Sequence, residues 1–397
     1  MKIYLSLAKA VVASLQLIFE ENKYADKVIE KTLKQNAKWG ARDRRFIAET
    51  TYDIVRWKRL YQEVSRSRDQ DYWKWLAVLI IQREFQFPDW PELSAVNIKD
   101  VRARLKSDHG TEIRESIPDW LHELGKKELG ERWEKELHAL NDQADVVLRV
   151  NTLKISKKDL AEKLLAEEIE ADGLADFPDA LILRKRQNIF QTPFFKDGLF
   201  EVMDAASQRI APFLNPGPGH RVVDACAGAG GKTLHLSALM NNKGKVFALD
   251  TEQWKLDELS KRARRAGAFN IEPRWIDSGK TIKRLENSAD RLLLDVPCSG
   301  LGVLKRNPDA KWKLSLDFIE RVKELQQNIL RDYCTIVKAG GVMVYSTCSI
   351  LPSENEQQVQ RFLGTESGKQ FELLDEQRCW PSEGFDGFYM ARMRRKI

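Results

Sequence analysis

The chain has 397 residues, of which 43% are hydrophobic and 31% are charged; this excludes an intrinsically disordered protein and suggests two or three domains. No apolar run approaches the roughly 20 residues of a membrane span, which excludes an integral membrane protein. Five cysteines without a C-x-x-C pair, and only five histidines, support neither a disulfide framework nor a metal site. The net charge of +6 is modest, and the excess of basic side chains lies in residues 1–50 and 251–350. Two such basic regions favour a polyanionic partner, but solvated lysines alone can also produce them.

Residues 1–135 are predicted to form a helical domain, because apolar residues recur every three or four positions and glycine is scarce. Residues 3–19 have this spacing and are interrupted by Lys9, which favours an amphipathic helix over a signal peptide and predicts a cytoplasmic protein. The basic helix start at residues 42–46 opposes the helix dipole, so its arginines either face water or meet phosphate. Six tryptophans lie here, and core packing is favoured over base stacking for them: Trp39, Trp57, Trp73, Trp75, Trp90 and Trp120.

Two further regions have α/β character. Residues 136–204 are predicted to be a small subdomain, with strands at 147–151 and 180–183 and a helix at 158–166. In residues 205–397, short apolar strands alternate with helices, which is typical of a parallel sheet covered on both faces. The expected strands are 221–225, 246–250, 272–277, 291–296 and 341–346, the main helices are 252–266 and 316–338, and 370–375 with 387–393 form an edge hairpin.

A glycine-rich loop, residues 224–233, follows the first of these strands. Its Gly-Gly-Lys-Thr end suggests a P-loop, but Cys226 replaces the glycine which that motif requires. The second strand ends in Asp250, twenty residues after Gly230, the spacing of an acid that binds a ribose. One strand-end acid would suit a helix cap, but four on one edge of the sheet favour a polar ligand. These acids are Asp224, Asp250, Asp277 and Asp295. S-adenosylmethionine, with its ribose, adenine and cationic amino-acid end, fits this site better than NAD.

Two cysteines follow strands at the same edge of the sheet. Cys298 lies in Asp-Val-Pro-Cys-Ser-Gly and Cys348 in Ser-Thr-Cys-Ser, whereas Cys334 and Cys379 suit buried packing. Methylation of C5 of a pyrimidine requires a thiolate that adds to C6 and an acid near N3. Either Cys298 or Cys348 can supply the thiolate, and Asp295 the acid.

These motifs resemble those of the RNA (cytosine-C5) methyltransferase family, in its bacterial Sun/Fmu branch that acts on ribosomal RNA. The resemblance covers most of residues 140–397, and the two cysteine motifs in this order carry it, together with residues 305–312 and 353–356. It implies a Rossmann-like, seven-stranded methyltransferase domain that depends on S-adenosylmethionine. A helical NusB-like domain and a small RRM-like α/β subdomain would precede that domain.

The resemblance also implies roles for individual residues. Cys348 would be the nucleophile, Cys298 would assist product release, and Asp295 would contact both cofactor and cytosine. Asp250 would hold the ribose and Asp277 the adenine. The loop that would cradle the methionine part consists of Cys226, Ala227, Gly228, Ala229, Gly230, Gly231 and Lys232. Where the family usually has Ala-Pro, this chain has Gly228-Ala229, which predicts a more flexible loop and weaker or slower cofactor binding.

The predicted function is therefore methylation of cytosine C5 in RNA, expected to be ribosomal, at a single-stranded or flipped-out base. Lys305, Arg306 and Lys311 are expected to contact RNA phosphate. The alternative is a non-catalytic RNA-binding or assembly factor that keeps the fold. An N6-adenine or DNA methyltransferase is disfavoured, because Asp-Val-Pro-Cys replaces the usual Asn/Asp-Pro-Pro-aromatic motif. The sequence leaves the target cytosine and the oligomeric state open.

Overall fold

The computed structural model describes residues 3–397, which divide into two compact units. The first unit contains the chain up to Asp142 together with Leu304–Ser315. The second contains Gln143–Val303 together with Leu316–Ile397. The segment Leu304–Ser315 therefore leaves the second unit, becomes part of the first, and returns. Within residues 3–397, none of the helices has the length and apolar character needed to cross a bilayer.

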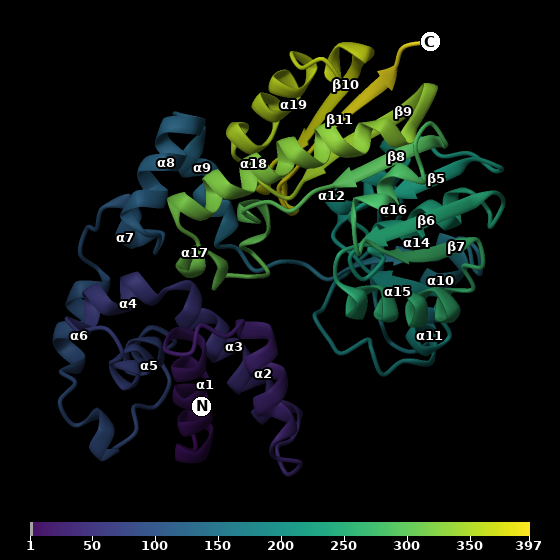
Figure 1. The fold of residues 1–397 in the computed structure, drawn as a ribbon. Coiled ribbons are helices and arrows are strands. Elements are labelled where there is room, and N and C mark those ends of the chain that lie inside the picture. Colours follow the sequence, from purple (N-terminus) through teal and green to yellow (C-terminus); the bar gives the residue numbers. More distant parts are fainter. Residues whose placement is uncertain (1–2) are drawn as a thin grey trace. The chain divides into compact units, whose positions relative to one another are not determined.

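The first unit is built from helices around the apolar helix α5 (Figure 1). The helices are α1 (Leu5–Phe19), α2 (Ala25–Lys34), α3 (Ala41–Arg56), α4 (Lys58–Ser65), α5 (Tyr72–Gln82), α6 (Ile98–Leu105), α7 (Thr111–Arg114), α8 (Asp119–Leu129), α9 (Arg132–Leu140) and α17 (Ala310–Lys313). Helix α5 is apolar on nearly every side and is the buried centre of the unit. Trp75 is buried in this core, and Trp312 packs against it together with four more of the six tryptophans named above: Trp39, Trp57, Trp73 and Trp90. Core packing is thus confirmed for five of those six, while the half-buried Trp120 lies outside the cluster.

The basic start of α3 serves the fold in a way that the sequence did not suggest. The guanidinium of Arg44 donates hydrogen bonds to the carbonyl oxygens of Leu33 at 2.7 Å, Trp39 at 2.9 Å and Asn36 at 3.3 Å. The last carbonyls of a helix have no partner within the helix, and a cation is favoured at that end. Arg44 therefore stabilises the end of α2 and the turn that follows it.

The segment Leu304–Ser315 completes the core of the helical unit. The indole nitrogen of Trp312 donates to the carbonyl oxygen of Val55 at 2.7 Å. Arg56 donates to the carbonyl oxygen of Lys305 at 2.9 Å. The Asp309 carboxylate accepts from the first backbone N–H of α2 at 3.1 Å. These contacts between distant parts of the chain explain why the segment belongs to this unit.

The same packing buries two of the three residues expected to contact RNA. Lys305 is 5% exposed and Lys311 is 2% exposed, whereas Arg306 is half-buried. The ammonium of Lys311 lies 3.3 Å from the side-chain oxygen of Asn141. A lysine held inside a helical unit cannot reach a phosphate unless it leaves that position. The phosphate contacts of Lys305 and Lys311 remain predictions, and their burial argues against them.

In the second unit, a small antiparallel sheet has the strand order β2-β3-β1-β4. Its elements are β1 (Val147–Val150), α10 (Lys157–Ala166), β2 (Ala171–Leu174), β3 (Phe177–Leu183), α11 (Pro193–Lys196) and β4 (Phe200–Val202). This βαββαβ order is that of the expected RRM-like subdomain. The carboxylate of Glu201 binds Arg262 at 3.0 Å and Arg265 at 2.5 Å, and Asn151 donates to the carbonyl oxygen of Ala266 at 2.8 Å. These contacts join the subdomain to helix α15 (Gln253–Ala266).

The larger sheet has seven strands in the order β10-β11-β9-β8-β5-β6-β7 (Figure 1). Its strands are β5 (Arg221–Asp224), β6 (Lys245–Asp250), β7 (Ile271–Trp275), β8 (Ala289–Asp295), β9 (Val337–Thr347), β10 (Phe371–Cys379) and β11 (Phe388–Arg395). The first five are parallel, and β11 and β10 run antiparallel to their neighbours. This confirms the predicted Rossmann-like fold.

Both faces of the large sheet are covered by helices. Leu292 and Leu294 belong to one apolar cluster with α16 (Gly279–Lys283), α18 (Leu316–Tyr333) and α19 (Glu356–Leu363). Leu293 belongs to the cluster on the other face, with α13 (Ile210–Leu214) and α14 (Gly231–Leu239). Alternate residues of a strand point to opposite faces, so apolar runs such as these indicate strands buried on both sides.

Two predicted boundaries differ from the structure. The predicted helix 316–338 ends at Tyr333, because Val337 already belongs to β9. The predicted edge hairpin forms, but β11 pairs with β9 and only β10 lies at the edge of the sheet. Strand β9 is therefore an inner strand. Because β9 also pairs in parallel with β8, the residues that follow these two strands lie side by side.

We expect Lys311→Met to stabilise the protein by about 1–2 kcal/mol at pH 7, because it removes a buried ammonium. Burial lowers the pKa of Lys311 well below its usual value. Between that lowered pKa and about 10.4, the folded state binds fewer protons than the unfolded state, so stability rises with pH. The substitution should flatten this rise. Urea unfolding at pH 7 and at higher pH measures both effects.

Lys127→Met, at an exposed position of α8, is the control for this prediction. It should change the free energy of unfolding by less than about 0.5 kcal/mol. A wild-type pH profile in the Lys311 variant would contradict our view that this ammonium is buried in the folded protein.

Candidate active site

The two cysteines meet at the carboxyl-terminal edge of the large sheet. Cys298 follows β8 and Cys348 follows the neighbouring strand β9, and their sulfur atoms are 3.3 Å apart. The backbone N–H of Gly302 donates to the carbonyl oxygen of Cys348 at 2.9 Å. A Cβ atom at Gly302 would lie 2.1 Å from the carbonyl oxygen of Gly387, so only glycine allows this close packing of three loops. The two half-buried thiols thus form a pair.

A cation and a carboxylate lie next to this pair. The ammonium of Lys232, in the first turn of α14, is 2.6 Å from one oxygen of Asp295, and Ser346 donates to the other oxygen at 2.9 Å. Burial alone would lower the pKa of Lys232, but Asp295 outweighs it, and Cys348 contributes in the same direction, so the pKa is raised. The ammonium of Lys232 therefore interacts favourably with the sulfur of Cys348. The hydrogen bond with Cys348, together with burial, raises the pKa of Cys298, which favours its thiol form.

Glu354 holds the two cysteine loops together and was assigned no role from the sequence. One of its oxygens accepts from the backbone N–H of Ser299 at 2.8 Å and from Gln326 at 3.1 Å. The other accepts from the hydroxyls of Ser299 at 2.5 Å and Ser349 at 2.6 Å. Glu354 is fully buried, and burial raises its pKa although the four donors oppose this. Because Ser299 and Ser349 each directly follow a cysteine, this carboxylate positions both thiols.

The glycine-rich loop encloses a cavity of about 120 Å³ beside Lys232 and Asp295. Its lining residues are Met203, Ser207, Asp224, Cys226, Ala227, Gly231, Lys232 and Asp295. Burial raises the pKa of Asp224 to about 7. One oxygen of Asp224 accepts from Thr233 at 2.7 Å, and within residues 3–397 the other has no hydrogen-bond partner. A buried, unsatisfied acceptor calls for a donor such as an amino group.

The loop leaves its backbone open to a ligand. A Cβ atom at Gly228 or Gly231 would have no described atom within 4 Å, so another molecule can come close to these residues. The volume and the carboxylates fit the amino-acid end of S-adenosylmethionine. The structure therefore brings five of the predicted cofactor residues together around one cavity: Cys226, Ala227, Gly231, Lys232 and Asp295.

Asp250 lies next to this loop, at the end of β6. It accepts from the backbone N–H of Gly228 at 2.8 Å and from that of Glu252 at 2.9 Å. The carbonyl oxygen of Ala229 accepts from Arg262 at 2.7 Å. The side chains of Asp250 and Arg262 thus hold the backbone of Gly228-Ala229, at the position where the family usually has Ala-Pro. Weaker cofactor binding through a flexible loop remains a prediction.

Asp277 lies apart from the other predicted residues. Strand β7 ends at Trp275, and Asp277 is exposed in the turn before α16. Ser278 and Thr281 donate to it at 3.0 and 3.2 Å and lower its pKa. It lines a separate hollow with Arg274, Trp275, Thr281 and Arg284. The contact of Asp277 with the adenine of the cofactor remains a prediction.

Comparisons with known proteins agree with this geometry. Residues 211–394 match the family described as "16S rRNA methyltransferase RsmB/F", and residues 117–190 match "Methyltr_RsmF/B-like, ferredoxin-like domain". A "Probable ribosomal RNA small subunit methyltransferase B" of Synechocystis is 38% identical over 274 residues, which are 68% of this chain but only 59% of that protein. The "Ribosomal RNA small subunit methyltransferase B" of Shewanella oneidensis is 34% identical over 78% of this chain and 75% of its own length.

Two solved structures share the fold. A crystal structure of a protein named PH0851 is 26% identical, covers 100% of both chains and has a TM-score of 0.83. A "Methyltransferase Homolog Protein from Pyrococcus Horikoshii" is 29% identical, covers 72% of this chain and 98% of its own, and has a TM-score of 0.64.

We expect Glu354→Gln to lower the free energy of unfolding by about 3 kcal/mol, because an amide NH₂ would face donors that the carboxylate now accepts from. We also expect faster alkylation of Cys298 and Cys348 by iodoacetamide, since their loops would lose a common anchor. Urea unfolding and mass spectrometry measure the two effects.

Glu324→Gln, which removes an exposed partner of Arg361, should change stability by less than about 0.5 kcal/mol. If the Glu354 variant has wild-type stability and thiol reactivity, this carboxylate does not hold the loops.

Proposed function

Since the chain belongs to the 16S rRNA methyltransferase RsmB/F family, we propose that it methylates C5 of a cytosine in RNA with S-adenosylmethionine as the methyl donor. The observation that carries this proposal is the pair of thiols 3.3 Å apart beside the Lys232–Asp295 ion pair. The names of the relatives make small-subunit ribosomal RNA the favoured substrate.

The residues around the glycine-rich loop are the ones that would hold the cofactor. Asp224 and Asp295 would receive its amino group, and Asp250 its ribose. When bound, S-adenosylmethionine supplies the electrophilic methyl group that C5 takes up. Cys226 stays a neutral thiol in this cavity, because burial and then Asp224 raise its pKa.

Cys348 is the nucleophile in this proposal. Its thiolate, whose charge would interact with the ammonium of Lys232, forms a bond from sulfur to C6 of the cytosine, and the electron pair of the C5–C6 double bond moves to C5. As the sulfur adds, N3 takes up a proton from solvent, and the Asp295 carboxylate accepts a hydrogen bond from this N3–H, which stabilises the ring while C6 is saturated. The orientation of Asp295 by Lys232 and Ser346 prepares it for this contact.

Cys298 acts in the second half of the reaction. The C5 proton must be removed so that the double bond re-forms and the sulfur of Cys348 leaves C6. The sulfur of Cys298 lies 3.3 Å from that of Cys348, so the Cys298 thiol can give its proton to the Cys348 sulfur as the S–C6 bond breaks, and the Cys298 thiolate formed in this way takes the C5 proton. We therefore assign proton removal and product release to Cys298.

We expect Cys348→Ala to abolish methylation, because no nucleophile remains. Cys298→Ala should instead trap RNA on Cys348, as an adduct that survives a denaturing gel, because release is blocked. Incubation with ribosomal RNA and tritium-labelled S-adenosylmethionine, followed by electrophoresis, measures both outcomes. Cys334→Ala, at a buried cysteine outside the site, is the control and should keep the activity.

Exchanged phenotypes of the two variants would make Cys298 the nucleophile. Absence of S-adenosylmethionine binding at millimolar concentration, measured by calorimetry on the wild-type protein, would instead support a non-catalytic RNA-binding factor.

A further inference from the structure

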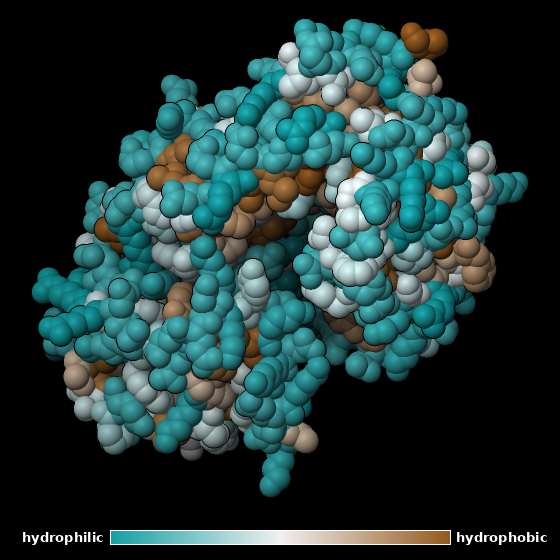
Figure 2. Space-filling view, in the orientation of Figure 1, coloured by the Kyte–Doolittle hydropathy of each residue, from teal (hydrophilic) through white to brown (hydrophobic). Residues whose placement is uncertain are grey.

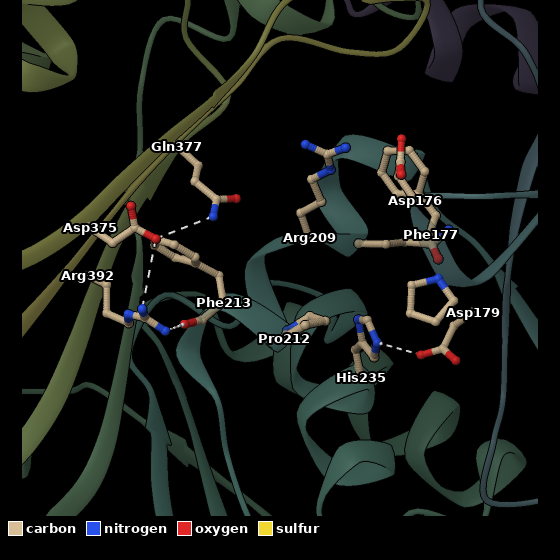
Figure 3. Close-up of a pocket in the computed structure, with 12 residues that line it drawn as sticks. Asp176, Phe177, Asp179, Arg209, Pro212, Phe213, His235, Asp375, Gln377 and Arg392 are labelled. Carbon is tan, nitrogen blue, oxygen red and sulfur yellow. Dashed lines mark hydrogen bonds and ion pairs between the residues drawn. The ribbon is translucent and has the colours of Figure 1, made fainter.

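A second cavity of the second unit, about 390 Å³ in volume, has no part in the site described above (Figure 3). Strand β3 forms one wall, β10 and β11 form the opposite wall, and the segment from α12 (Ala205–Gln208) to α14 lies between them. Asp176, Pro178, Pro212 and Gln377 are exposed at its rim, so the cavity opens to solvent. Its volume is in the range of small-molecule sites.

Two arginines of the lining each lie over a phenylalanine ring. The guanidinium of Arg209 lies 4.6 Å from the ring centre of Phe177, and that of Arg392 lies 5.0 Å from the ring centre of Phe213. Figure 3 shows Phe177 and Asp179 on one side, Asp375 and Arg392 on the other, and Arg209 between them. Planar guanidinium and aromatic groups bind flat, unsaturated rings by stacking.

The polar lining contains three carboxylates as well as the two guanidinium groups, and Asp375 is already bound by Arg392 at 3.8 Å and Gln377 at 3.4 Å. Asp176, Asp179 and Asp375 contribute carboxylates to the lining. His235 is bound to Asp179 through Nε2 at 3.1 Å, and burial lowers its pKa to about 4, so the ring is neutral. Within residues 3–397, neither Nδ1 of His235 nor Oε1 of the buried Gln208 has a hydrogen-bond partner. The cavity therefore suits a ligand that donates through N–H groups.

We propose that this cavity binds a nucleobase carrying an amino group, from a part of the RNA strand away from the methylated cytosine; this rests on the proposed function. A phosphate group is disfavoured inside the cavity by the carboxylates of Asp176, Asp179 and Asp375. A lysine or arginine side chain of a protein is disfavoured by Arg209 and Arg392. A flat, neutral ring with N–H donors can stack on the planar groups of the lining and can donate hydrogen bonds to its acceptors.

The test is the binding of two labelled oligonucleotides, penta-adenylate and penta-uridylate, to the full chain. Neither contains cytosine, and saturating S-adenosylhomocysteine keeps adenine out of the cofactor site. Fluorescence anisotropy at one fixed salt concentration gives the affinities. The wild-type protein should bind penta-adenylate more tightly, because only adenine has an amino group.

Arg209→Ala should weaken penta-adenylate binding about tenfold and penta-uridylate binding less than twofold, because a stacking surface is lost. Arg209→Lys keeps the charge without the plane and should be as weak as Arg209→Ala. Arg184→Ala is the control, since it removes an exposed arginine of the small α/β subdomain that pairs with Glu170 and Asp172. Equal melting temperatures show that the variants are folded.

Three outcomes would overturn the proposal: equal binding of the two oligonucleotides to the wild-type protein, an unchanged affinity in Arg209→Ala, or wild-type affinity in Arg209→Lys. Methylation of ribosomal RNA by the wild-type protein is measured separately. If methylation occurs and the base preference is absent, only the second cavity has been misassigned.

Discussion

The close approach of the two cysteine thiols depends on the buried carboxylate of Glu354. Neighbouring strands of a sheet lie about 4.8 Å apart, but the sulfur atoms after β8 and β9 are only 3.3 Å apart. The sheet alone therefore does not set this distance, and the two loops must converge beyond the strand ends. Glu354 draws them together, because its two oxygens bind the residues that directly follow Cys298 and Cys348. Its buried charge is tolerated because every donor around it is directed at it.

A single cation, Lys232, interacts with two charged or polar partners at the thiol pair. Lys232 neutralises Asp295 and interacts with Cys348, so that one cation serves both the carboxylate and the sulfur. Lys232 belongs to the first turn of α14, which follows the glycine-rich loop directly. The loop that would receive the cofactor therefore also positions the cation that interacts with Cys348. In the proposed reaction, one short stretch of chain would thus contact both the cofactor and the nucleophile.

The sequence predicted those parts of the structure that depend on local patterns. Apolar runs identify the inner parallel strands β5, β6, β8 and β9, because such strands are buried on both faces, whereas the inner position of β11 was not predicted. The two cysteines follow neighbouring strands, so their meeting at one edge could be foreseen from the strand order of the fold. Asp277 could not be placed, since β7 ends two residues before it and the turn points the carboxylate outward. Glu354 was missed because a glutamate in a short polar stretch usually faces water. Lys311 looked like a phosphate ligand for the same reason, but its burial follows from contacts with residues far away in the sequence.

The segment Leu304–Ser315 makes the helical unit discontinuous in sequence. Trp312 and Asp309 contact α3 and the start of α2, which precede them by more than 250 residues. During synthesis on the ribosome, the amino-terminal helices emerge first, but they cannot complete their core until this segment has been translated. The last step of their folding thus waits for most of the second unit to be made. Maturation of the first domain is thereby coupled to the elongation of the second, and a nascent chain that stalls before residue 304 would expose an unfinished apolar surface.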